Sequence, residues 1–357
     1  MSIGKKIMIL FIYMCLLSSC SDNVNEQDGI IEDFVIRENI DKDVTQKITD
    51  NLSHNAFTDL VFFNNQFFLT FREGSQHVTG KDGVIIIYSS FDAINWILIK
   101  TISTAGIDLR DPKFSVNDDK LMLYIHGSQF INSNLVGRFD YVLKYFDESG
   151  WSNIENVYLD NLKISTYPIK INGNEAWPWR ITWHKNKAYS VGYNGYDIFD
   201  LYQSDDGVFF KGLNAFQKRQ GIPTEATVRF NTNGEMFILY RNNQGNSFIG
   251  KSTIYVSDWD WFHEIPIISF GGPNFIFLDE VNILITGRES NQLILSLYNI
   301  TTNEYKKLLT LESGGDCGYA GMIIKDDFLY LSYYSSHAGP TGSSVYVAKI
   351  SIKKLKF

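Results

Sequence analysis

Hydrophobic and polar positions along the chain repeat six times in one order. Each copy has a short polar or Gly/Pro motif, an apolar run, a polar turn, a second apolar run, and a polar or charged residue. The copies begin at positions 54, 108, 177, 222, 271 and 316, at intervals of 54, 69, 45, 49 and 45 residues. Such intervals are long enough for the four-stranded blades of a β-propeller with variable loops. The pattern therefore predicts an all-β protein, a six-bladed β-propeller.

Two further strands follow several of these paired runs and complete the predicted blades. Examples are Val84–Tyr88 with Trp96–Lys100, and Val345–Ile350 near the end of the chain. An aromatic content of 15% agrees with sheets, because aromatic residues favour strands. We expect the segment Ile30–Arg37 to complete the last blade, which closes the ring and hides its edges.

The first twenty residues have the pattern of an export signal. Lys5 and Lys6 precede an uncharged apolar run from Ile7 to Leu17, which is short for a membrane-spanning helix. The ending Leu-Ser-Ser-Cys20 resembles the lipobox of bacterial lipoproteins, in which the cysteine is acylated. This predicts a signal peptide at 1–20, a tether with a first outer strand at 21–50, and the propeller at 51–357. The protein is then lipid-anchored to the outer membrane through Cys20.

Charge and cysteine content exclude some classes of binding partner, disulfide and metal site. The chain has 32 basic and 40 acidic residues, a net charge of −8, and no basic tract, which argues against nucleic acid. Of the three cysteines, Cys15 leaves with the signal and Cys20 carries lipid, so Cys317 alone remains. One thiol makes neither an internal disulfide nor a cysteine metal site. We expect a monomer with no cofactor and no metal.

Propeller geometry sorts the polar motif residues onto one face. The innermost strand of each blade runs away from the face where it starts, and the second strand returns to that face. Motif residues at the start of the first strand and the end of the second thus surround the central channel together. These are Asp59, Arg72, His77, Arg110, Asp111, His126, Arg180, Glu225, Arg241, Arg288, Asp316, Tyr319 and His337. Convergent polar groups in a concavity predict a binding site, and nearby Trp177, Trp179, Tyr193 and Tyr334 suit stacking on sugar rings.

Two turns between outer strands resemble a known family motif. The turns run from Ser90 to Trp96 and from Ser204 to Phe210, each with an aspartate two residues after the serine. Both are similar to the Asp-box, a structural Ser-x-Asp-x-Gly-x-x-Trp turn of sialidase-like propellers. In this motif the aspartate and glycine shape the turn, and the aromatic residue packs beneath the blade.

Two stretches of the inner strands resemble the sialidase superfamily more closely. Thr224-Glu225-Ala-Thr-Val228, with Arg241 sixteen residues after Glu225, is similar to a sialidase hairpin that presents a glutamate and an arginine. Gly318-Tyr319-Ala-Gly-Met322 is similar to the last-blade strand that presents the nucleophilic tyrosine. The resemblance covers about residues 50 to 353. It also extends to sialidase-like lipoproteins of glycan-degrading Bacteroidetes.

The resemblance implies a mechanism. Tyr319 attacks the anomeric carbon, Glu225 acts as its base, and an aspartate protonates the leaving group. Arg241 and Arg288 hold the substrate carboxylate, and a neutral tyrosine avoids repulsion with that carboxylate.

The chain also departs from the family pattern. Phe57-Thr58-Asp59 replaces the expected Arg-Ile-Pro, so one arginine of the triad is missing, unless Arg72 reaches the carboxylate from the neighbouring strand. The acid stays open among Asp59, Asp82 and Asp111, with His77 as a further possibility. Asp108-Leu-Arg-Asp-Pro112 resembles instead the Arg-Asp-Pro motif of five-bladed fructosidases and arabinosidases.

These observations favour an exo-acting, sialidase-like glycoside hydrolase that removes a terminal acidic sugar from a complex glycan. The predicted catalytic residues are Tyr319, Glu225, Asp59 and Asp111. The predicted substrate-binding residues are Arg72, Arg110, Arg180, Arg241, Arg288, His77, Trp179, Asn274, Asp316 and His337. Two alternatives stay open, a glycan-binding lipoprotein that has lost catalysis and a propeller polysaccharide lyase.

Overall fold

The structure, a computed structural model, describes residues 44–78, 80–166, 171–213, 216, 220–252, 259–339 and 341–355. The predicted signal peptide at 1–20, Cys20 and the segment at 30–37 lie outside the described residues. The described residues belong to one unit that starts at Asp43. Among them, no helix is long and apolar enough to cross a membrane.

The strands form six successive sheets along the chain, and parallel pairing of Tyr158–Asp160 with Phe209–Lys211 joins the outer edges of the second and third into one continuous sheet. The first sheet contains β2 (His54–Phe63), β3 (Gln66–Gly74), β4 (Val84–Ser90) and β5 (Ile97–Ile102). The second contains β6 (Asp108–Asn117), β7 (Lys120–Ile131), β8 (Asn134–Phe146) and β10 (Glu155–Asp160), with β9 (Gly150–Trp151) and β11 (Asn172–Gly173) paired to β8. The third contains β12 (Trp177–Pro178), β13 (Thr182–His184), β14 (Lys187–Tyr193), β15 (Phe199–Ser204) and β16 (Phe209–Gly212).

The other three sheets repeat the antiparallel four-stranded order. The fourth contains β17 (Pro223–Phe230), β18 (Met236–Asn242), β19 (Asn246–Ser252) and β20 (Asp260–Ile268). The fifth contains β21 (Gly271–Phe277), β22 (Asn282–Glu289), β23 (Gln292–Asn299) and β24 (Tyr305–Thr310). The sixth contains β25 (Cys317–Lys325), β26 (Phe328–Ser335), β27 (Ser344–Ser351) and β1 (Val44–Lys47), and a short 3-10 helix, η1 (Ile352–Lys354), follows β27.

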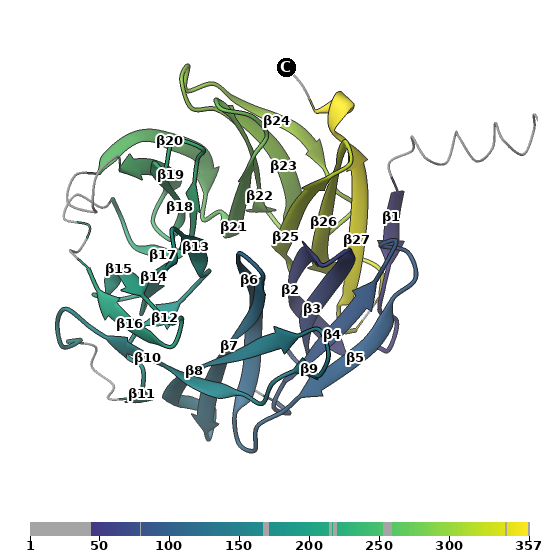
Figure 1. The fold of residues 1–357 in the computed structure, drawn as a ribbon, viewed down its shortest axis with the longest axis vertical. Coiled ribbons are helices and arrows are strands. Elements are labelled where there is room, and N and C mark those ends of the chain that lie inside the picture. Colours follow the sequence, from purple (N-terminus) through teal and green to yellow (C-terminus); the bar gives the residue numbers. More distant parts are fainter. Residues whose placement is uncertain are drawn as a thin grey trace, which may run out of the picture. The chain divides into compact units, whose positions relative to one another are not determined.

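Within this unit the sheets stand around a common centre, with β2, β6, β13, β17, β21 and β25 innermost (Figure 1). Each innermost strand contacts the innermost strand of the sheet on either side, and β25 of the sixth sheet contacts β2 of the first. In five sheets the innermost strand starts within one residue of the repeat start in the sequence, and in the third sheet the short strand β12 starts at the repeat position, Trp177. The predicted all-β class is therefore confirmed, and the six repeats correspond to six sheets.

The sixth sheet is completed by a different segment from the one predicted. β1 pairs antiparallel with β27, with Val44 opposite Lys349. Residues 44–47 thus take the outer position that we expected for residues 30–37. Three of the four β1 residues are exposed, so this edge strand lacks the apolar run on which the prediction depended.

Hydrophobic side chains fill the space between neighbouring sheets. One cluster joins Leu69 and Ile86 of the first sheet to Tyr330 and Val347 of the sixth. Similar clusters join the fourth sheet to the fifth and the fifth to the sixth. Because burial of apolar area contributes roughly 25 cal/mol per Å², these clusters hold the sheets side by side.

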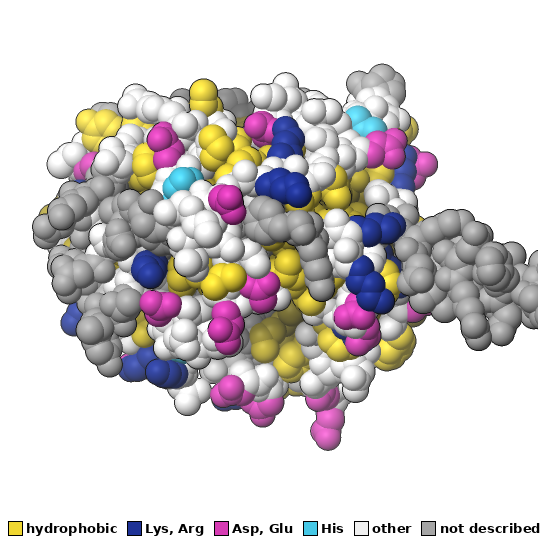
Figure 2. Space-filling model, turned by 90° about the horizontal axis from the view of Figure 1, so that it is seen from above, with side chains coloured by type: hydrophobic (Ala, Val, Ile, Leu, Met, Phe, Trp, Pro, Cys, Tyr) yellow, Lys and Arg dark blue, Asp and Glu magenta, His cyan; other side chains and the backbone are white. Residues whose placement is uncertain are grey.

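Charged side chains are mixed on the side of the molecule that Figure 2 shows. There, Lys and Arg lie among Asp and Glu and do not merge into one basic patch. With 40 acidic and 32 basic residues in the chain, this side offers no continuous basic surface to a polyanion.

The two predicted Asp-box turns join outer strands, β4 to β5 and β15 to β16. Asp92 Oδ1 accepts hydrogen bonds from the backbone N–H groups of Ile94 and Asn95, both at 2.8 Å. Asp206 Oδ1 accepts in the same way from Val208 and Phe209, at 2.8 and 2.9 Å. The hydrogen bond from Asn95 is the main reason that the pKa of Asp92 lies well below its usual range.

We predict that Asp92→Ala lowers the free energy of unfolding by about 1 kcal/mol at neutral pH, because the turn loses its acceptor. Since the pKa of Asp92 is lower in the folded protein, its contribution is present above about pH 4 and declines as the pH falls. Chemical denaturation at pH 7 and pH 3 measures both effects.

The matched control is Asp119→Ala, an exposed aspartate in the turn between β6 and β7. It should change stability by less than about 0.5 kcal/mol. An equal loss in both variants would show that the Asp92 turn has no special role.

Candidate active site

The innermost strands share a β-bulge near their start, where two residues lie opposite one on the next strand. The bulges lie between Ala56 and Asp59, Arg110 and Lys113, Pro223 and Ala226, Gly271 and Asn274, and Gly318 and Gly321. In the third sheet, β12 and β13 are separate strands at this level. A bulge bends its strand and redirects a side chain.

The first residue of the bulge has a positive φ in four strands: Phe57 at 60°, Asp111 at 48°, Gly272 at 60° and Tyr319 at 52°. Residues other than glycine rarely adopt this conformation, and such strain concentrates at functional sites. The bulges therefore mark one level of the propeller as the candidate site.

The central feature of this level is a hydrogen bond between Tyr319 and Glu225. Tyr319 Oη, from β25, donates to Glu225 Oε1, from β17, at 2.6 Å. The second carboxylate oxygen, Oε2, accepts from the backbone N–H of Gly272 at 2.6 Å. Tyr319 and Glu225 are only 8% and 5% exposed. The two residues that the sequence paired as nucleophile and base therefore lie within hydrogen-bonding distance.

Burial and the charge of Glu225 raise the pKa of Tyr319 well above its usual value. Tyr319 is therefore a neutral phenol at neutral pH, and it is the donor in the bond to Glu225. This is the protonation state that a base needs in order to remove the phenolic proton as the oxygen attacks.

Gly272 leaves the space through which Tyr319 passes. A Cβ atom at position 272 would lie 2.9 Å from Tyr319 Cγ and 3.0 Å from Tyr319 Cα. Both distances are too short for carbon atoms, and the φ of +60° also favours glycine. The fifth sheet thus contributes free space and one backbone N–H, and no side chain, at this position.

Two arginines at the ends of second strands face the same pair. Arg241 donates to Glu225 Oε1 at 3.2 Å, and this carboxylate is the main reason that the pKa of Arg241 is raised. Arg288 donates to the backbone oxygen of Cys317 at 3.0 Å. Both side chains are 22% exposed, so each guanidinium has N–H groups within reach of an anionic ligand.

The second sheet supplies an arginine and an aspartate from its bulge. Arg110 lies 4.9 Å from the ring centre of Phe57, which replaces the arginine of the family pattern. Arg110 Nε also donates to Asp111 Oδ2 at 3.3 Å. Asp111 Oδ1 is buried and has no hydrogen-bond partner among the described residues. The negative charge of Asp111 also contributes to the raised pKa of Tyr319.

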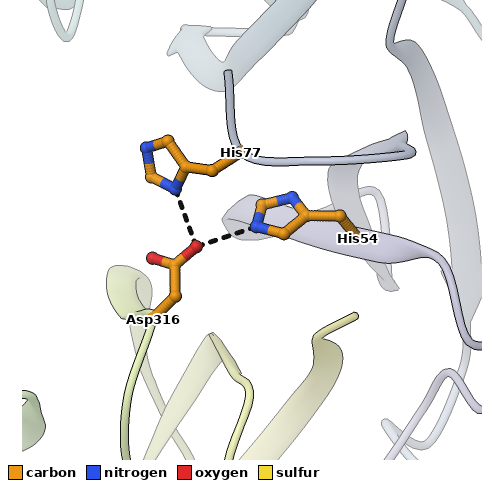
Figure 3. Close-up of side chains that lie close together, drawn as sticks. All are labelled: His54, His77 and Asp316. Carbon is orange, nitrogen blue, oxygen red and sulfur yellow. Dashed lines mark hydrogen bonds and ion pairs between the residues drawn. The ribbon is translucent and has the colours of Figure 1, made fainter. Parts of the chain in front are cut away.

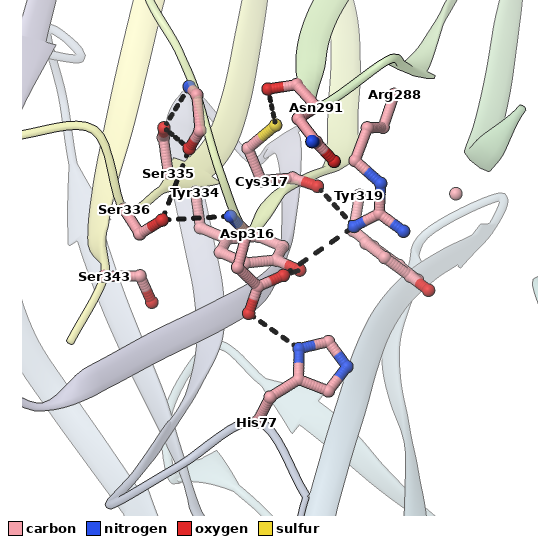
Figure 4. Close-up of polar contacts among 12 residues, drawn as sticks. His77, Arg288, Asn291, Asp316, Cys317, Tyr319, Tyr334, Ser335, Ser336 and Ser343 are labelled. Carbon is pink, nitrogen blue, oxygen red and sulfur yellow. Dashed lines mark hydrogen bonds and ion pairs between the residues drawn. The ribbon is translucent and has the colours of Figure 1, made fainter. Parts of the chain in front are cut away.

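A third group lies beside the arginines, where His54 and His77 both contact Asp316 Oδ2, at 2.8 and 2.7 Å (Figure 3). Asp316 Oδ1 accepts from Tyr334 Oη at 2.8 Å and lies 3.7 Å from Arg288 (Figure 4). The atoms of His54, His77 and Asp316 that could bind a metal ion lie within 4.8 Å of one another, as in some metal sites. Here, however, one nitrogen of each histidine already forms a hydrogen bond with the same oxygen, Asp316 Oδ2.

Several predicted site residues lie one layer deeper, where they hold the propeller together. Asp59 accepts from Arg180 at 2.9 Å and from the backbone N–H of Phe114 at 2.7 Å, and it is 3% exposed. Asn274 is fully buried and donates to the backbone oxygen of Ala320. Arg180 donates to the same oxygen. The structure therefore does not place these residues to contact a ligand at Tyr319.

Other predicted residues are also occupied elsewhere. Arg72 is fully buried in an ion pair with Asp108 at 2.7 Å, so it does not replace the missing arginine. Trp179 is 3% exposed and packs with its ring centre 5.5 Å from that of Tyr319, as a wall of the site. His337 bonds to Ser335 Oγ at 2.8 Å within the sixth sheet, and Asp82 is exposed.

The sequence analysis missed His54. It opens the first repeat and therefore had the required signal, a polar residue at the start of an innermost strand. Its partner Asp316 opens the sixth repeat, so the contact depends on the first and sixth sheets being neighbours.

The structure is similar to solved sialidases. Trypanosoma rangeli sialidase matches with a TM-score of 0.61 and 13% identity, over 85% of this chain and 56% of that chain. Phage phi92 endosialidase matches with a TM-score of 0.67 and 12% identity, over 88% and 70%. The fold is that of the sialidases. An intramolecular trans-sialidase from Ruminococcus gnavus, at a TM-score of 0.60 and 12% identity, is matched over 85% of this chain and 96% of its own.

The chain thus spans little more than half of the trypanosomal sialidase. No family model matches the sequence, and no curated protein matches it. At these identities the similarity establishes the sialidase-like fold alone. A conclusion about activity depends on the chemistry of the site.

We predict that Gly272→Ala destabilises the protein by more than Gly106→Ala, because only position 272 has Tyr319 in the path of the new methyl group. Gly106 has a similar φ of 72° and no heavy atom within 4 Å of its Cβ position, so its variant measures backbone strain alone, about 1 kcal/mol. Denaturation midpoints of the two variants test this difference. Equal midpoints would show that Tyr319 moves aside at no cost.

Proposed function

We propose that this protein is a sialidase-like glycoside hydrolase that removes a terminal acidic sugar from a glycan. The observation that carries the proposal is the buried 2.6 Å hydrogen bond from Tyr319 to Glu225, next to two part-exposed arginines. The proposal agrees with the fold, which the chain shares with sialidases and trans-sialidases.

In the proposed reaction Tyr319 Oη attacks the anomeric carbon while Glu225 takes the phenolic proton. Glu225 is held for this role by the N–H of Gly272 and by Arg241. A phenol suits a substrate that carries a carboxylate beside the anomeric carbon, because a neutral nucleophile is not repelled by that charge. The covalent sugar–Tyr319 intermediate is then released by water, as in retaining glycosidases.

The substrate carboxylate would bind Arg241 and Arg288, which share the site with Tyr319. Charge-assisted hydrogen bonds from guanidinium groups favour planar carboxylates. Arg110 adds a third positive charge, 4.9 Å from the ring centre of Phe57. Phe57 stands where the family pattern has an arginine, so the charge of Arg110 beside it supports the proposal.

One observation favours the non-catalytic alternative, a glycan-binding protein. The first arginine of the family pattern is absent. Arg110 comes from a different strand and forms ion pairs with Asp108 and Asp111. If catalysis is lost, the site binds acidic sugars without releasing product. The lyase alternative gains no specific support from the described residues.

We also propose that the N-terminal segment anchors the protein to the outer membrane through a lipid on Cys20. The support is the charged start, the apolar run and the Leu-Ser-Ser-Cys20 ending. Such an anchor would place the site outside the cytoplasm, where large glycans are met. Metabolic labelling with an alkyne fatty acid in a bacterial host, lost in Cys20→Ala, tests it.

We predict that Tyr319→Phe lowers kcat on an aryl sialoside by about a thousandfold or more, because the nucleophilic oxygen is removed. The fold should be retained, since the aromatic ring stays in place. The assay follows release of the fluorescent aglycone from the 4-methylumbelliferyl glycoside of N-acetylneuraminic acid.

The matched control is Tyr333→Phe, a buried tyrosine in β26 whose hydroxyl donates to the backbone oxygen of Glu312. It should keep wild-type turnover. Full activity in Tyr319→Phe would refute the assignment, and binding of the sugar without turnover by the wild type would favour the non-catalytic alternative.

We predict that Arg241→Ala weakens kcat/KM by about 10- to 150-fold for an acidic sugar, the effect of a lost hydrogen bond to a charged group. Inhibition by a free sialic acid analogue should weaken in parallel, because both depend on the carboxylate. A variant that keeps its affinity for the analogue would show that Arg241 serves Glu225 alone.

A further inference from the structure

Three segments of the chain bring His54, His77 and Asp316 together beside Arg288. His54 starts β2, His77 lies between β3 and β4, and Asp316 directly precedes β25 (Figure 3). The side chain of His77 is 40% exposed, whereas that of His54 is 8% exposed. Because the side chain of Asp316 is 29% exposed, His77 is the most accessible member of this cluster.

The hydrogen bonds determine which nitrogen of His77 is available. An ionised carboxylate oxygen only accepts hydrogen bonds, so His77 Nδ1 must carry the proton that it shares with Asp316 at 2.7 Å. Several donors keep the pKa of Asp316 below its usual range despite its partial burial, foremost among them His54 and His77. The other nitrogen, His77 Nε2, makes no hydrogen bond to any described residue. Asp316 thus orients the ring and leaves Nε2 free to exchange a proton.

The same geometry does not suit a bound cation. Asp316 Oδ2 receives both histidine N–H groups, while Oδ1 receives Tyr334 and lies 3.7 Å from the guanidinium of Arg288. A metal-bound histidine normally donates its second N–H to a partner, and the buried Nδ1 of His54 has none among the described residues. The cluster is built as a hydrogen-bond network around one carboxylate.

One aromatic ring, that of Phe57, connects His77 to the nucleophile. Its ring packs edge-on against Phe57 at 5.0 Å between ring centres, and Phe57 packs edge-on against Tyr319 at 5.3 Å. In Figure 4, His77 lies below Asp316, and Tyr319 lies beside Arg288. The charged or titratable groups that face His77 are Asp316, its neighbour His54, and Arg110, which donates to the backbone oxygen of His77.

Asp111 is the other acid candidate left at the site. It is 5% exposed, and its Oδ2 is engaged by Arg110 at 3.3 Å. His77 is more accessible, and it has the oriented, unbonded nitrogen that proton transfer requires.

We propose that His77, oriented by Asp316, is the general acid and base that acts on the leaving group and on the attacking water. This inference rests on the proposed function and names the residue for a step that the sequence left open among three aspartates and His77.

In the first step the Tyr319 oxygen bonds to the anomeric carbon and the glycosidic bond breaks. The proton of Tyr319 goes to Glu225. His77 enters this step as an imidazolium with a proton on each nitrogen, and the proton on Nε2 goes to the departing oxygen. In the second step His77 Nε2 takes a proton from water, whose oxygen bonds to the anomeric carbon. The bond to Tyr319 breaks, and Glu225 returns its proton. Each step conserves atoms and charge without another reactant.

The test compares two substrates with different leaving groups, the 4-methylumbelliferyl glycoside of N-acetylneuraminic acid and sialyllactose. An aryl alcohol departs without protonation, whereas the sugar alcohol of lactose needs an acid. His77→Gln should therefore lose about 10²- to 10⁴-fold in kcat/KM on sialyllactose and less than about tenfold on the aryl glycoside. His77→Ala should regain part of its sialyllactose activity when imidazole is added.

Two matched variants complete the experiment. His184→Gln removes a histidine that stacks on Phe230 at 4.1 Å outside the site, and it should match the wild type on both substrates. Asp111→Asn should show no selective loss on sialyllactose. A selective loss of kcat/KM on sialyllactose in Asp111→Asn overturns the assignment to His77. The assignment is also overturned if His77→Gln keeps the same fraction of wild-type kcat/KM on both substrates. If a chelator abolishes the activity of the wild type and only added zinc restores it, the assignment to His77 is overturned as well. A wild type inactive on both substrates refutes the proposed function itself.

Discussion

The site depends on one backbone constraint, the bulge near the start of the innermost strands. A regular strand would alternate its side chains between the two faces of its sheet, and none of them would reach the centre from a strand end. The bulge gives Tyr319 a positive φ and directs its ring over Gly272 to Glu225, so three consecutive sheets are needed for one hydrogen bond. The same irregularity turns Phe57 and Asp111 toward the centre.

Much of this arrangement could be predicted from the repeat pattern. Each repeat places its motif at the same position of its sheet, so the spacing of the repeats alone assigns Tyr319, Glu225, Arg241 and Arg288 to one face. The partner of each charged residue could not be predicted in this way. Arg72 with Asp108, and Asp59 with Arg180, are ion pairs between sheets that satisfy buried charges. The sequence does not distinguish such a pair from an arginine and an aspartate that await a ligand.

β1 and His54 show a second limit. Edge strands carry few buried residues, so residues 44–47 have no apolar pattern, whereas the apolar residues near position 35 drew the prediction to the wrong segment. His54 had the right repeat position, yet its importance comes from Asp316 at the other end of the chain. Both features depend on contacts between residues from opposite ends of the folded unit, which local sequence does not encode.

The pairing of β1 with β27 has a consequence for folding. Val44 and Lys349 are partners, so the sixth sheet contains residues from both ends of the folded unit. Such a pairing has a high contact order, and its loop-closure entropy must be overcome late, after the intervening sheets have formed. During synthesis the first five sheets can assemble in order, but β27 keeps an unpaired edge until β1 docks. Loss of only a few residues at this N-terminal strand would thus leave a sheet edge open to pairing with another molecule.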